Sequence, residues 1–188
     1  MRVNVISDLH LEFADLELPG GDVLVISGDA CESRTLRKYK YDANNILGES
    51  PNGKRLDRAA RFFNEEVTKY RRAIYVMGNH EHYHGKFYKT YHELVAEVPD
   101  NVHVLEKENV IIDGVVFIGA TLWTDCNRGN PLTIQVLKHG MNDYRAITHH
   151  ITVPYDNYRK LDPRDTCEDH ARAKEYIKTI CELNRDKK

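Results

Sequence analysis

Short, unbroken apolar runs in the first half of the chain each end in polar residues. They cover residues 3–7, 23–27 and 73–77. Runs of this length, rich in Val and Ile, are typical of strands buried on both faces of a parallel sheet. Residues 57–70 place apolar side chains at helical spacing and predict an amphipathic helix between the second and third strands. The pattern therefore predicts an α/β fold.

The rest of the chain predicts two more helices, one hairpin and one long irregular stretch. The helices cover 87–98 and 170–184, the hairpin pairs 110–112 with 115–118, and the irregular stretch covers 121–165. Pro99 ends the first of these helices, and Asp113-Gly114 between two apolar runs is a strong hairpin signal. Because the chain contains no linker and no repeat, we expect residues 1–188 to form a single domain.

Side chains that can bind metal ions follow each of the first three strands. The motifs are Asp8-Leu9-His10, Gly28-Asp29 and Gly78-Asn79-His80-Glu81. The carboxyl ends of parallel strands meet at one edge of a sheet, where ligands bind, so we expect the three motifs to converge. In extended backbone, Asp8 and His10 would also point the same way. One such pair alone is more readily a surface pair, but three on successive strand ends indicate a metal site.

The chemistry that these residues predict is hydrolysis. Asp29 has two carboxylate oxygens and could bridge two cations, which hydrolytic sites hold about 3.5–4 Å apart. Such a pair lowers the pKa of a shared water, so that hydroxide can attack phosphorus, and it screens the phosphoryl charge. His80 could hydrogen-bond a phosphoryl oxygen or protonate the leaving group. The glycines before Asp29 and Asn79 would let the backbone approach the metal without a Cβ clash.

Several other polar residues have two interpretations. His82 and His84 either approach the substrate or lie in a solvated loop, and the loop is the more common case. Glu81 either orients His80 or stabilises the start of the following helix with its charge. Residues 34–41 mix basic and aromatic side chains, as nucleic-acid surfaces do, although charged runs are more often simply solvated.

Composition limits the expected cellular location and the general classes of binding partner, but it does not identify the substrate. Charged residues make up 30 % of the chain and the formal net charge is −2, while the mean hydropathy is −0.60. These values give no general attraction to nucleic acid or membrane. With no stretch long enough for a membrane span and no signal-peptide pattern, we expect a cytoplasmic protein. The four cysteines, Cys31, Cys126, Cys167 and Cys181, are then expected to be free thiols.

The three motifs together resemble the calcineurin-like metallophosphoesterase superfamily. The resemblance implies a four-layer α-β-β-α sandwich with two divalent metal ions that cleaves phosphoester bonds. It implies that Asp8 and His10 bind the first ion, that Asp29 bridges, that Asn79 binds the second ion, and that His80 is catalytic. The ions could be Mn, Fe, Zn, Ni or Mg. The substrate partner would be a phosphomonoester, a nucleotide or a nucleic-acid phosphodiester. Leu122-Trp123-Thr124 also resembles a segment of bacterial and phage members.

The resemblance weakens toward the carboxyl terminus. The family's Gly-His-x-His motif is absent, and Thr148-His149-His150 follows a polar segment rather than an apolar strand. We therefore expect a carboxyl-terminally incomplete fold whose second metal site is weak. An exposed apolar sheet edge would then favour a homo-oligomer or a complementing carboxyl-terminal fragment. The main expectation is a metal-dependent phosphoesterase; the alternative is a catalytically impaired scaffold or binding protein with the same fold.

Overall fold

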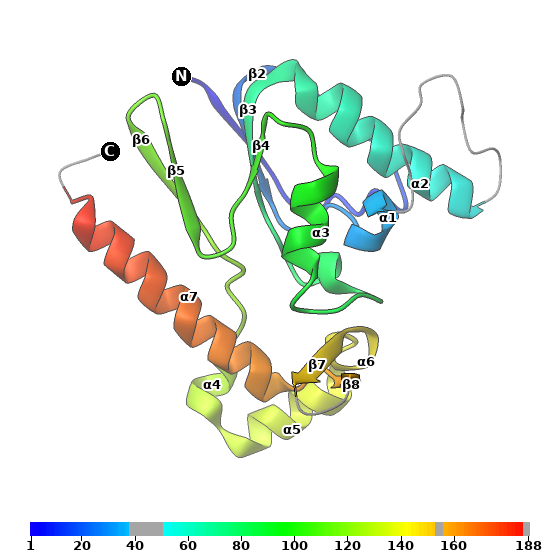
Figure 1. The fold of residues 1–188 in the computed structure, drawn as a ribbon, viewed down its shortest axis with the longest axis vertical. Coiled ribbons are helices and arrows are strands. Elements are labelled where there is room, and N and C mark those ends of the chain that lie inside the picture. Colours follow the sequence, from blue (N-terminus) through cyan, green and yellow to red (C-terminus); the bar gives the residue numbers. More distant parts are fainter. Residues whose placement is uncertain (38–50, 153–155, 186–188) are drawn as a thin grey trace.

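Four parallel strands form the central sheet of the computed structural model, which describes residues 1–37, 51–152 and 156–185 (Figure 1). The strands are β1 (Val3–Ile6), β2 (Gly21–Ser27), β3 (Tyr70–Val76) and β4 (Val102–Val104), and they lie side by side in that order. The three strands predicted from the apolar runs are confirmed, as is their parallel pairing. Their carboxyl ends therefore lie next to one another.

Helices cover one face of this sheet. They are α1 (Ser33–Arg37), α2 (Pro51–Arg61) and α3 (Thr90–Glu97), and α2 continues into the π-helical turn η1 (Phe62–Glu66) and the 3-10 turn η2 (Val67–Lys69). Phe63 and Leu94 from these segments pack against Leu24 and Tyr75 of the strands in one buried cluster. The helix predicted over 57–70 is thus confirmed in place, but it starts earlier and its last turns depart from regular α geometry.

A β-hairpin covers the opposite face. It consists of β5 (Glu108–Ile112) and β6 (Val115–Gly119), paired antiparallel as predicted. Val23 and Ile74, which alternate with the helix-facing residues of their strands, cluster with Ile112 of the hairpin. Val3 and Val5 of the outer strand β1 remain 39 % and 65 % exposed. The hairpin therefore covers the middle of the sheet and leaves β1 open on this side.

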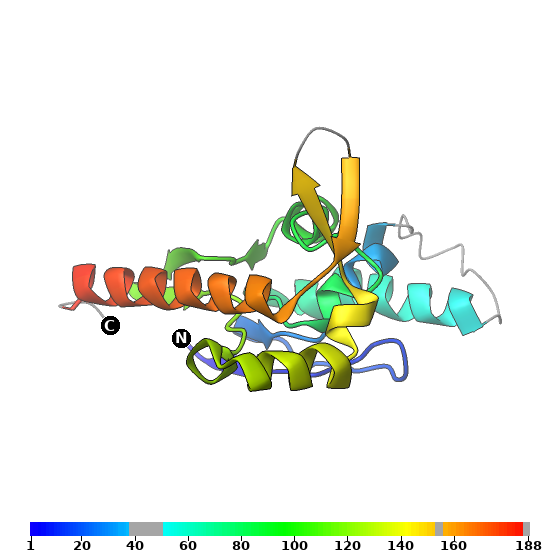
Figure 2. The same cartoon turned by 90° about the horizontal axis from the view of Figure 1, so that it is seen from below.

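The stretch 121–165 is not irregular, and this prediction was wrong. It contains α4 (Cys126–Gly129), α5 (Pro131–Gly140), α6 (Asp143–Ala146), β7 (Thr148–Thr152) and β8 (Asp156–Lys160), which form a small lobe (Figures 1 and 2). Asn130 caps α5 by accepting from the backbone of Leu132 and Thr133, with Pro131 at the first helical position. Asn-Pro is a recognisable helix start, so the signal was present in the sequence.

The last helix, α7 (Pro163–Leu183), joins this lobe to the hairpin (Figure 2). It begins earlier than predicted because Asp162 and Asp165 form a capping box ahead of the apolar pattern. Cys126 and Cys167 form a disulfide between α4 and α7, with a Cα–Cα distance of 6.2 Å. The prediction of four free thiols was therefore wrong for this pair, because the fold brings together two residues too distant in sequence to be paired by spacing. Cys31 and Cys181 are free.

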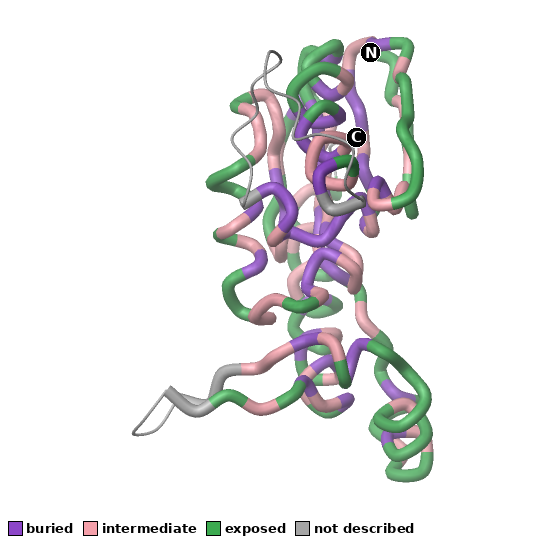
Figure 3. The backbone as a smooth tube through the Cα atoms, turned by 90° about the vertical axis from the view of Figure 1, so that its right-hand side faces the viewer, coloured by how far each residue is buried: buried purple, intermediate pink, exposed green. Residues whose placement is uncertain are grey.

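A second, smaller core holds the lobe against the sheet domain. Tyr144, Ile147 and Leu161 form it, and Tyr83 and Phe87 from the segment after β3 pack against it. Figure 3 shows that buried positions gather around the central strands, with fewer in the lobe. The segment that follows β3 therefore lies between the two cores.

Candidate metal centre

The loops after β1 and β2 run side by side beyond the end of the sheet. The backbone N–H groups of Asp8 and His10 donate to the carbonyl oxygens of Gly28 and Asp29 at 3.1 and 3.0 Å, and Leu11 donates to Ala30 at 2.9 Å. These bonds extend the β1–β2 pairing by several residues. The first two motifs are thus held together by backbone hydrogen bonds and do not depend on a metal for their proximity.

Asp8, His10 and Asp29 form a cluster of candidate metal ligands. One ligand atom from each lies within 4.8 Å of the others. All three have positive φ, at 53°, 45° and 53°, so the expectation that extended backbone aligns Asp8 with His10 was wrong. Left-handed backbone is uncommon for residues other than glycine and costs about 1–3 kcal/mol each. Such strain concentrates at functional sites, and here it accompanies the convergence of three candidate ligand side chains.

The loop after β3 completes this edge of the sheet. The backbone N–H of His80 donates to Asp29 Oδ1 at 2.9 Å. A Cβ on Gly78 would lie 2.2 Å from that same oxygen, and a Cβ on Gly28 would lie 2.9 Å from Gly78 Cα. The two glycines therefore allow the loops to approach each other, which differs from the predicted role of letting backbone approach a metal.

Glu81 links the loops from beneath. Its side chain is fully buried, and it accepts hydrogen bonds from four donors: the backbone N–H groups of Asp29, Ala30 and Gly78 and the hydroxyl of Tyr75, at 2.7–3.1 Å. Burial raises the pKa of this carboxyl above its usual value. Neither predicted role for Glu81 describes these contacts, because its partners are the backbone of the β2 loop, its own loop and a core tyrosine.

The His80 imidazole contacts two other rings. Its centroid is 4.6 Å from that of His10, edge to face, and 4.5 Å from that of Tyr83. The Tyr83 hydroxyl interacts in turn with the side chains of Asn79 and Asp143, and burial followed by the Asp143 charge raises the pKa of Tyr83. Asn79 and His80 thus both contact Tyr83, which comes from the segment that packs against the small core.

Glu12 is a member of the site that the sequence analysis did not identify. His10, Glu12 and His80 form a second cluster whose ligand atoms all lie within 4.8 Å of one another. The Glu12 side chain is only 6 % exposed. The alternation Asp8, His10, Glu12 continues the first motif by one step and was the available signal. Arg58, which donates to the Leu11 carbonyl at 2.9 Å, ties α2 to this segment.

The histidines beyond His80 do not join either cluster. His82 is buried and its Nδ1 lies 2.8 Å from Thr90 Oγ1. Burial, with a smaller effect of Lys107, lowers its pKa to about 3, so the imidazole is neutral. The solvated-loop interpretation was therefore wrong for His82, but His84 has a side chain that is 50 % exposed.

Thr148-His149-His150 lies at the start of strand β7. The His149 ring stacks on Phe87 with a centroid distance of 6.0 Å, and His149 lines a cavity of about 320 Å³ together with Trp123. His149 is absent from both clusters of candidate metal ligands among the described residues. The structure thus gives His149 a packing contact with Phe87.

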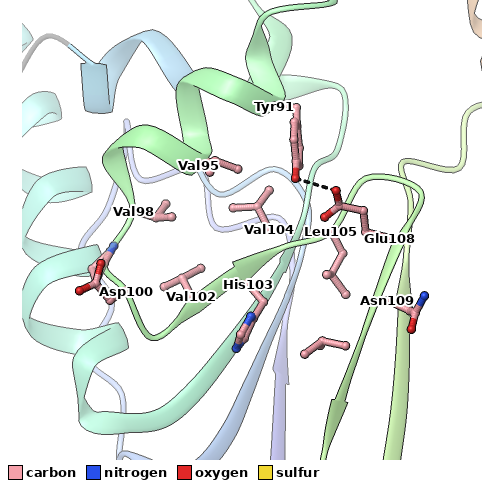
Figure 4. A pocket seen from close by; sticks show the side chains of 12 residues that line it. Tyr91, Val95, Val98, Asp100, Val102, His103, Val104, Leu105, Glu108 and Asn109 are labelled. Atoms are coloured by element: carbon pink, nitrogen blue, oxygen red, sulfur yellow. Dashed lines mark hydrogen bonds between the residues drawn. The ribbon is translucent and has the colours of Figure 1, made fainter.

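A second cavity of about 320 Å³ lies between α3, β4 and β5 (Figure 4). Val95 and Val104 contribute to its wall, and the Tyr91 hydroxyl donates to Glu108 across its rim at 2.9 Å. Burial and this bond raise the pKa of Tyr91 to about 12. None of its lining residues belongs to the clusters at the sheet edge, so the cavity is separate from the candidate metal centre.

The residues at the sheet edge fit divalent metal ions. Imidazole and carboxylate donors are what Zn, Mn and Fe prefer, and the Nδ1 atoms of His10 and His80 are buried without a hydrogen-bond partner among the described residues. Buried polar atoms normally have a partner. Half of the basic and aromatic segment 34–41, residues 38–41, lies outside the described residues. Within residues 1–37, 51–152 and 156–185, no helix has the length and apolar character needed to cross a bilayer.

Comparisons with known proteins agree with this chemistry. A family model described as "Calcineurin-like phosphoesterase" matches residues 1–178. An uncharacterized protein of Acanthamoeba polyphaga mimivirus is 28 % identical over 161 residues, which covers 78 % of this chain and 52 % of that protein. The chain thus spans about half the length of this curated relative.

Proposed function

The chain belongs to the calcineurin-like phosphoesterase family, and on that basis we propose that it is a metal-dependent phosphoesterase acting on phosphomonoesters or phosphodiesters. The observation that carries the proposal is the cluster of Asp8, His10 and Asp29 at the carboxyl ends of adjacent parallel strands. Ligands bind at this edge in open α/β sheets. Left-handed backbone at all three residues further supports a functional role.

In this proposal Asp8, His10 and Asp29 hold the first ion, and Asp29 and Asn79 hold the second. When bound, the ions would lower the pKa of water and neutralise charge on the phosphoryl oxygens. Asp29 is held in place because its Oδ1 accepts from the His80 backbone and its own N–H donates to Glu81. The carboxylate that serves both ions is therefore oriented before any ligand arrives.

His80 supplies the proton in this proposal. Its side chain is 18 % exposed, which leaves part of the ring accessible to a substrate at the sheet edge. The rings of His10 and Tyr83 both contact the His80 ring and limit its rotation. An imidazole held in this way can hydrogen-bond a phosphoryl oxygen or protonate the departing alkoxide.

A second candidate function is a scaffold or binding protein that keeps the fold. Structural and catalytic zinc sites usually have three or four protein ligands per ion, whereas the proposed second site has Asp29 and Asn79 alone. His149, from the Thr148-His149-His150 segment, packs on Phe87 and belongs to neither cluster of candidate ligands among the described residues. The shortage of ligands at the second site is the observation that favours this alternative.

An activity assay separates the two functions. We expect protein stripped with a chelator to be inactive toward bis(p-nitrophenyl) phosphate and p-nitrophenyl phosphate, and to gain activity when Mn²⁺ is restored, because the ions supply the electrophilic chemistry. Release of p-nitrophenol is the readout. Absence of turnover with Mn, Fe, Zn, Ni and Mg in turn would favour the scaffold.

Manganese titration tests the inequality of the two sites. Calorimetry is expected to show at most one tight Mn²⁺ site per chain, because three protein ligands converge at Asp8, His10 and Asp29 while Asn79 adds only one to the bridge. Stripped protein without substrate is the sample, and the Asp8→Asn variant is the control that should weaken this site. Two tight sites of similar affinity would contradict the expectation.

A further inference from the structure

We propose that His10, Glu12 and His80 form a second ion site, selective for zinc-like cations and exclusive of the Asp8–His10–Asp29 site. When an ion occupies it, His80 is withdrawn from proton transfer, so the site is inhibitory; this consequence rests on the proposed phosphoesterase function. The cation-binding step itself does not depend on that function.

The spacing of the donors favours a shared ion over a direct hydrogen bond. Glu12 Oε1 lies 3.8 Å from His80 Nδ1, which is too long for a hydrogen bond. Two ligands at zinc bond lengths of about 2.0–2.2 Å are separated by roughly 3.4–3.8 Å when the angle between them is about 110–130°. His10 lies within the same 4.8 Å limit from both, so a small adjustment brings three donors onto one ion.

The donor atoms are buried and unsatisfied. Three atoms have no hydrogen-bond partner among the described residues: Glu12 Oε2, His10 Nδ1 and His80 Nδ1. Only 6 % of the Glu12 side chain is exposed. Burying a carboxylate oxygen without a hydrogen-bond donor or a cation beside it costs free energy, and folded proteins normally supply one of the two. An ion between the three side chains would satisfy the two imidazole nitrogens, and a Glu12 carboxylate that binds it through both oxygens would satisfy Oε2 as well.

Neighbouring residues hold one oxygen of Glu12 and leave the other, Oε2, without a hydrogen bond among the described residues. Glu12 Oε1 accepts from the backbone N–H of Glu32 at 2.9 Å. Arg55 lies 3.7 Å from the same oxygen but makes its close contact, at 2.5 Å, with Glu32 Oε1. Burial alone would raise the pKa of Glu32, but hydrogen bonds and ion pairs with Arg34 and Arg55 hold that pKa below its usual value. The guanidinium charge is thus largely neutralised by Glu32, and Glu12 Oε2 remains available.

The two clusters differ in donor type, and they share one imidazole. His10, Glu12 and His80 offer two nitrogens and one oxygen, whereas Asp8, His10 and Asp29 offer one nitrogen and two oxygens. Imidazole suits zinc, and carboxylate suits manganese and magnesium. A neutral imidazole has one unprotonated nitrogen, so His10 can serve only one ion at a time. Zinc and manganese therefore compete through His10.

Cobalt binding tests the site without any measurement of catalysis. In an Asp8→Asn background the first site loses a carboxylate and the proposed site keeps all three ligands. We expect this variant to bind one Co²⁺ with visible d–d absorption bands that shift on binding. Adding Glu12→Gln, which keeps an oxygen for the Glu32 N–H, is expected to weaken Co²⁺ binding at least tenfold. Glu97→Gln, on the exposed face of α3, is the matched control and should leave binding unchanged.

Two results would overturn the site. One is Co²⁺ binding of equal affinity in Asp8→Asn and Asp8→Asn/Glu12→Gln, and the other is an absence of Co²⁺ binding in Asp8→Asn. Circular dichroism verifies the fold of each variant. Should the Glu12 variant not fold, Asp8→Asn/His80→Gln removes a different ligand of the same site, and its binding must also fall at least tenfold.

An inhibition experiment separates this proposal from the proposed function. With Mn²⁺-activated protein, added Zn²⁺ is expected to suppress hydrolysis of bis(p-nitrophenyl) phosphate, and Glu12→Gln is expected to need at least tenfold more Zn²⁺ for the same suppression. Equal sensitivity of the two proteins refutes the inhibitory role. If the protein hydrolyses no phosphoester but binds Co²⁺ in a Glu12-dependent way, the proposed function is refuted and the proposed ion site is supported.

Discussion

Replacing Asp29 by asparagine is expected to lower metal-dependent phosphoester hydrolysis at least about 100-fold, the scale seen when one charge-stabilising group is removed from an active site. Asp29 is the proposed ligand of both ions, and asparagine removes the negative charge while leaving one oxygen to accept from the His80 backbone. The variant should therefore fold normally and fail in metal binding. Initial rates with bis(p-nitrophenyl) phosphate and Mn²⁺ are the measurement.

The control for this substitution is Asp100→Asn. Asp100 is an exposed residue in the turn before β4, outside both clusters of candidate ligands, and the chemical change is identical. Its activity should stay within about twofold of the unmodified chain, since exposed substitutions away from a site have small effects. An Asp29→Asn protein that keeps more than a tenth of the original rate would argue against Asp29 as the bridging ligand.

Replacing Glu81 by alanine is expected to reduce the free energy of unfolding by about 3–5 kcal/mol, because it leaves several buried donors without an acceptor. Those donors are three backbone N–H groups and the Tyr75 hydroxyl. The loss is concentrated where the β2 and β3 loops meet, so the position of Asp29 should be disturbed as well. Urea unfolding followed by circular dichroism measures the stability, and manganese titration measures the site.

Two further variants make the Glu81 result specific. Glu97→Ala removes an exposed carboxylate from α3 and is expected to change stability by less than about 0.5 kcal/mol. Glu81→Gln keeps the size of the side chain but turns an –NH₂ group toward N–H donors, so it should destabilise less than alanine and still weaken metal binding. If Glu81→Ala unfolds within 1 kcal/mol of the unmodified chain, its four hydrogen bonds do not stabilise the loops as argued.

Local sequence patterns were enough to predict three of the four strands of the sheet and the edge at which the candidate ligands gather, but not the short strand β4. The apolar runs before Asp8, Asp29 and Asn79 are strands. Their short length and their β-branched residues are typical of buried strands. Parallel pairing of consecutive strands then places their carboxyl ends together, whatever the loops do. The metal-binding and catalytic roles of these residues remain predictions for the experiments above.

The same reasoning did not extend to contacts between residues distant in the chain. Glu81 was expected to act near its own loop, yet its partners include the backbone of Asp29 and Ala30. Glu12 continues the alternation of Asp8 and His10, but only the fold shows that it lies beside His80. Cys126 and Cys167 are 41 residues apart and meet because α4 and α7 pack together. Periodicity and spacing describe the neighbours of a residue along the chain, and none of these partners is such a neighbour.

The loop residues at the sheet edge show most clearly which features the sequence predicts and which depend on the tertiary structure. Residue types at positions 8, 10 and 29 predict chelating chemistry from the primary structure, because few other uses need carboxylate and imidazole groups after buried strands. Their left-handed backbone, however, is a minority conformation that residue type alone does not predict, although Asp and His adopt it more readily than most residues. It is maintained by hydrogen bonds between the β1 and β2 loops and by the absence of a Cβ at Gly78. Local propensities thus establish which groups stand at the sheet edge, and long-range packing determines where those groups point, since only packing can offset the cost of strained backbone.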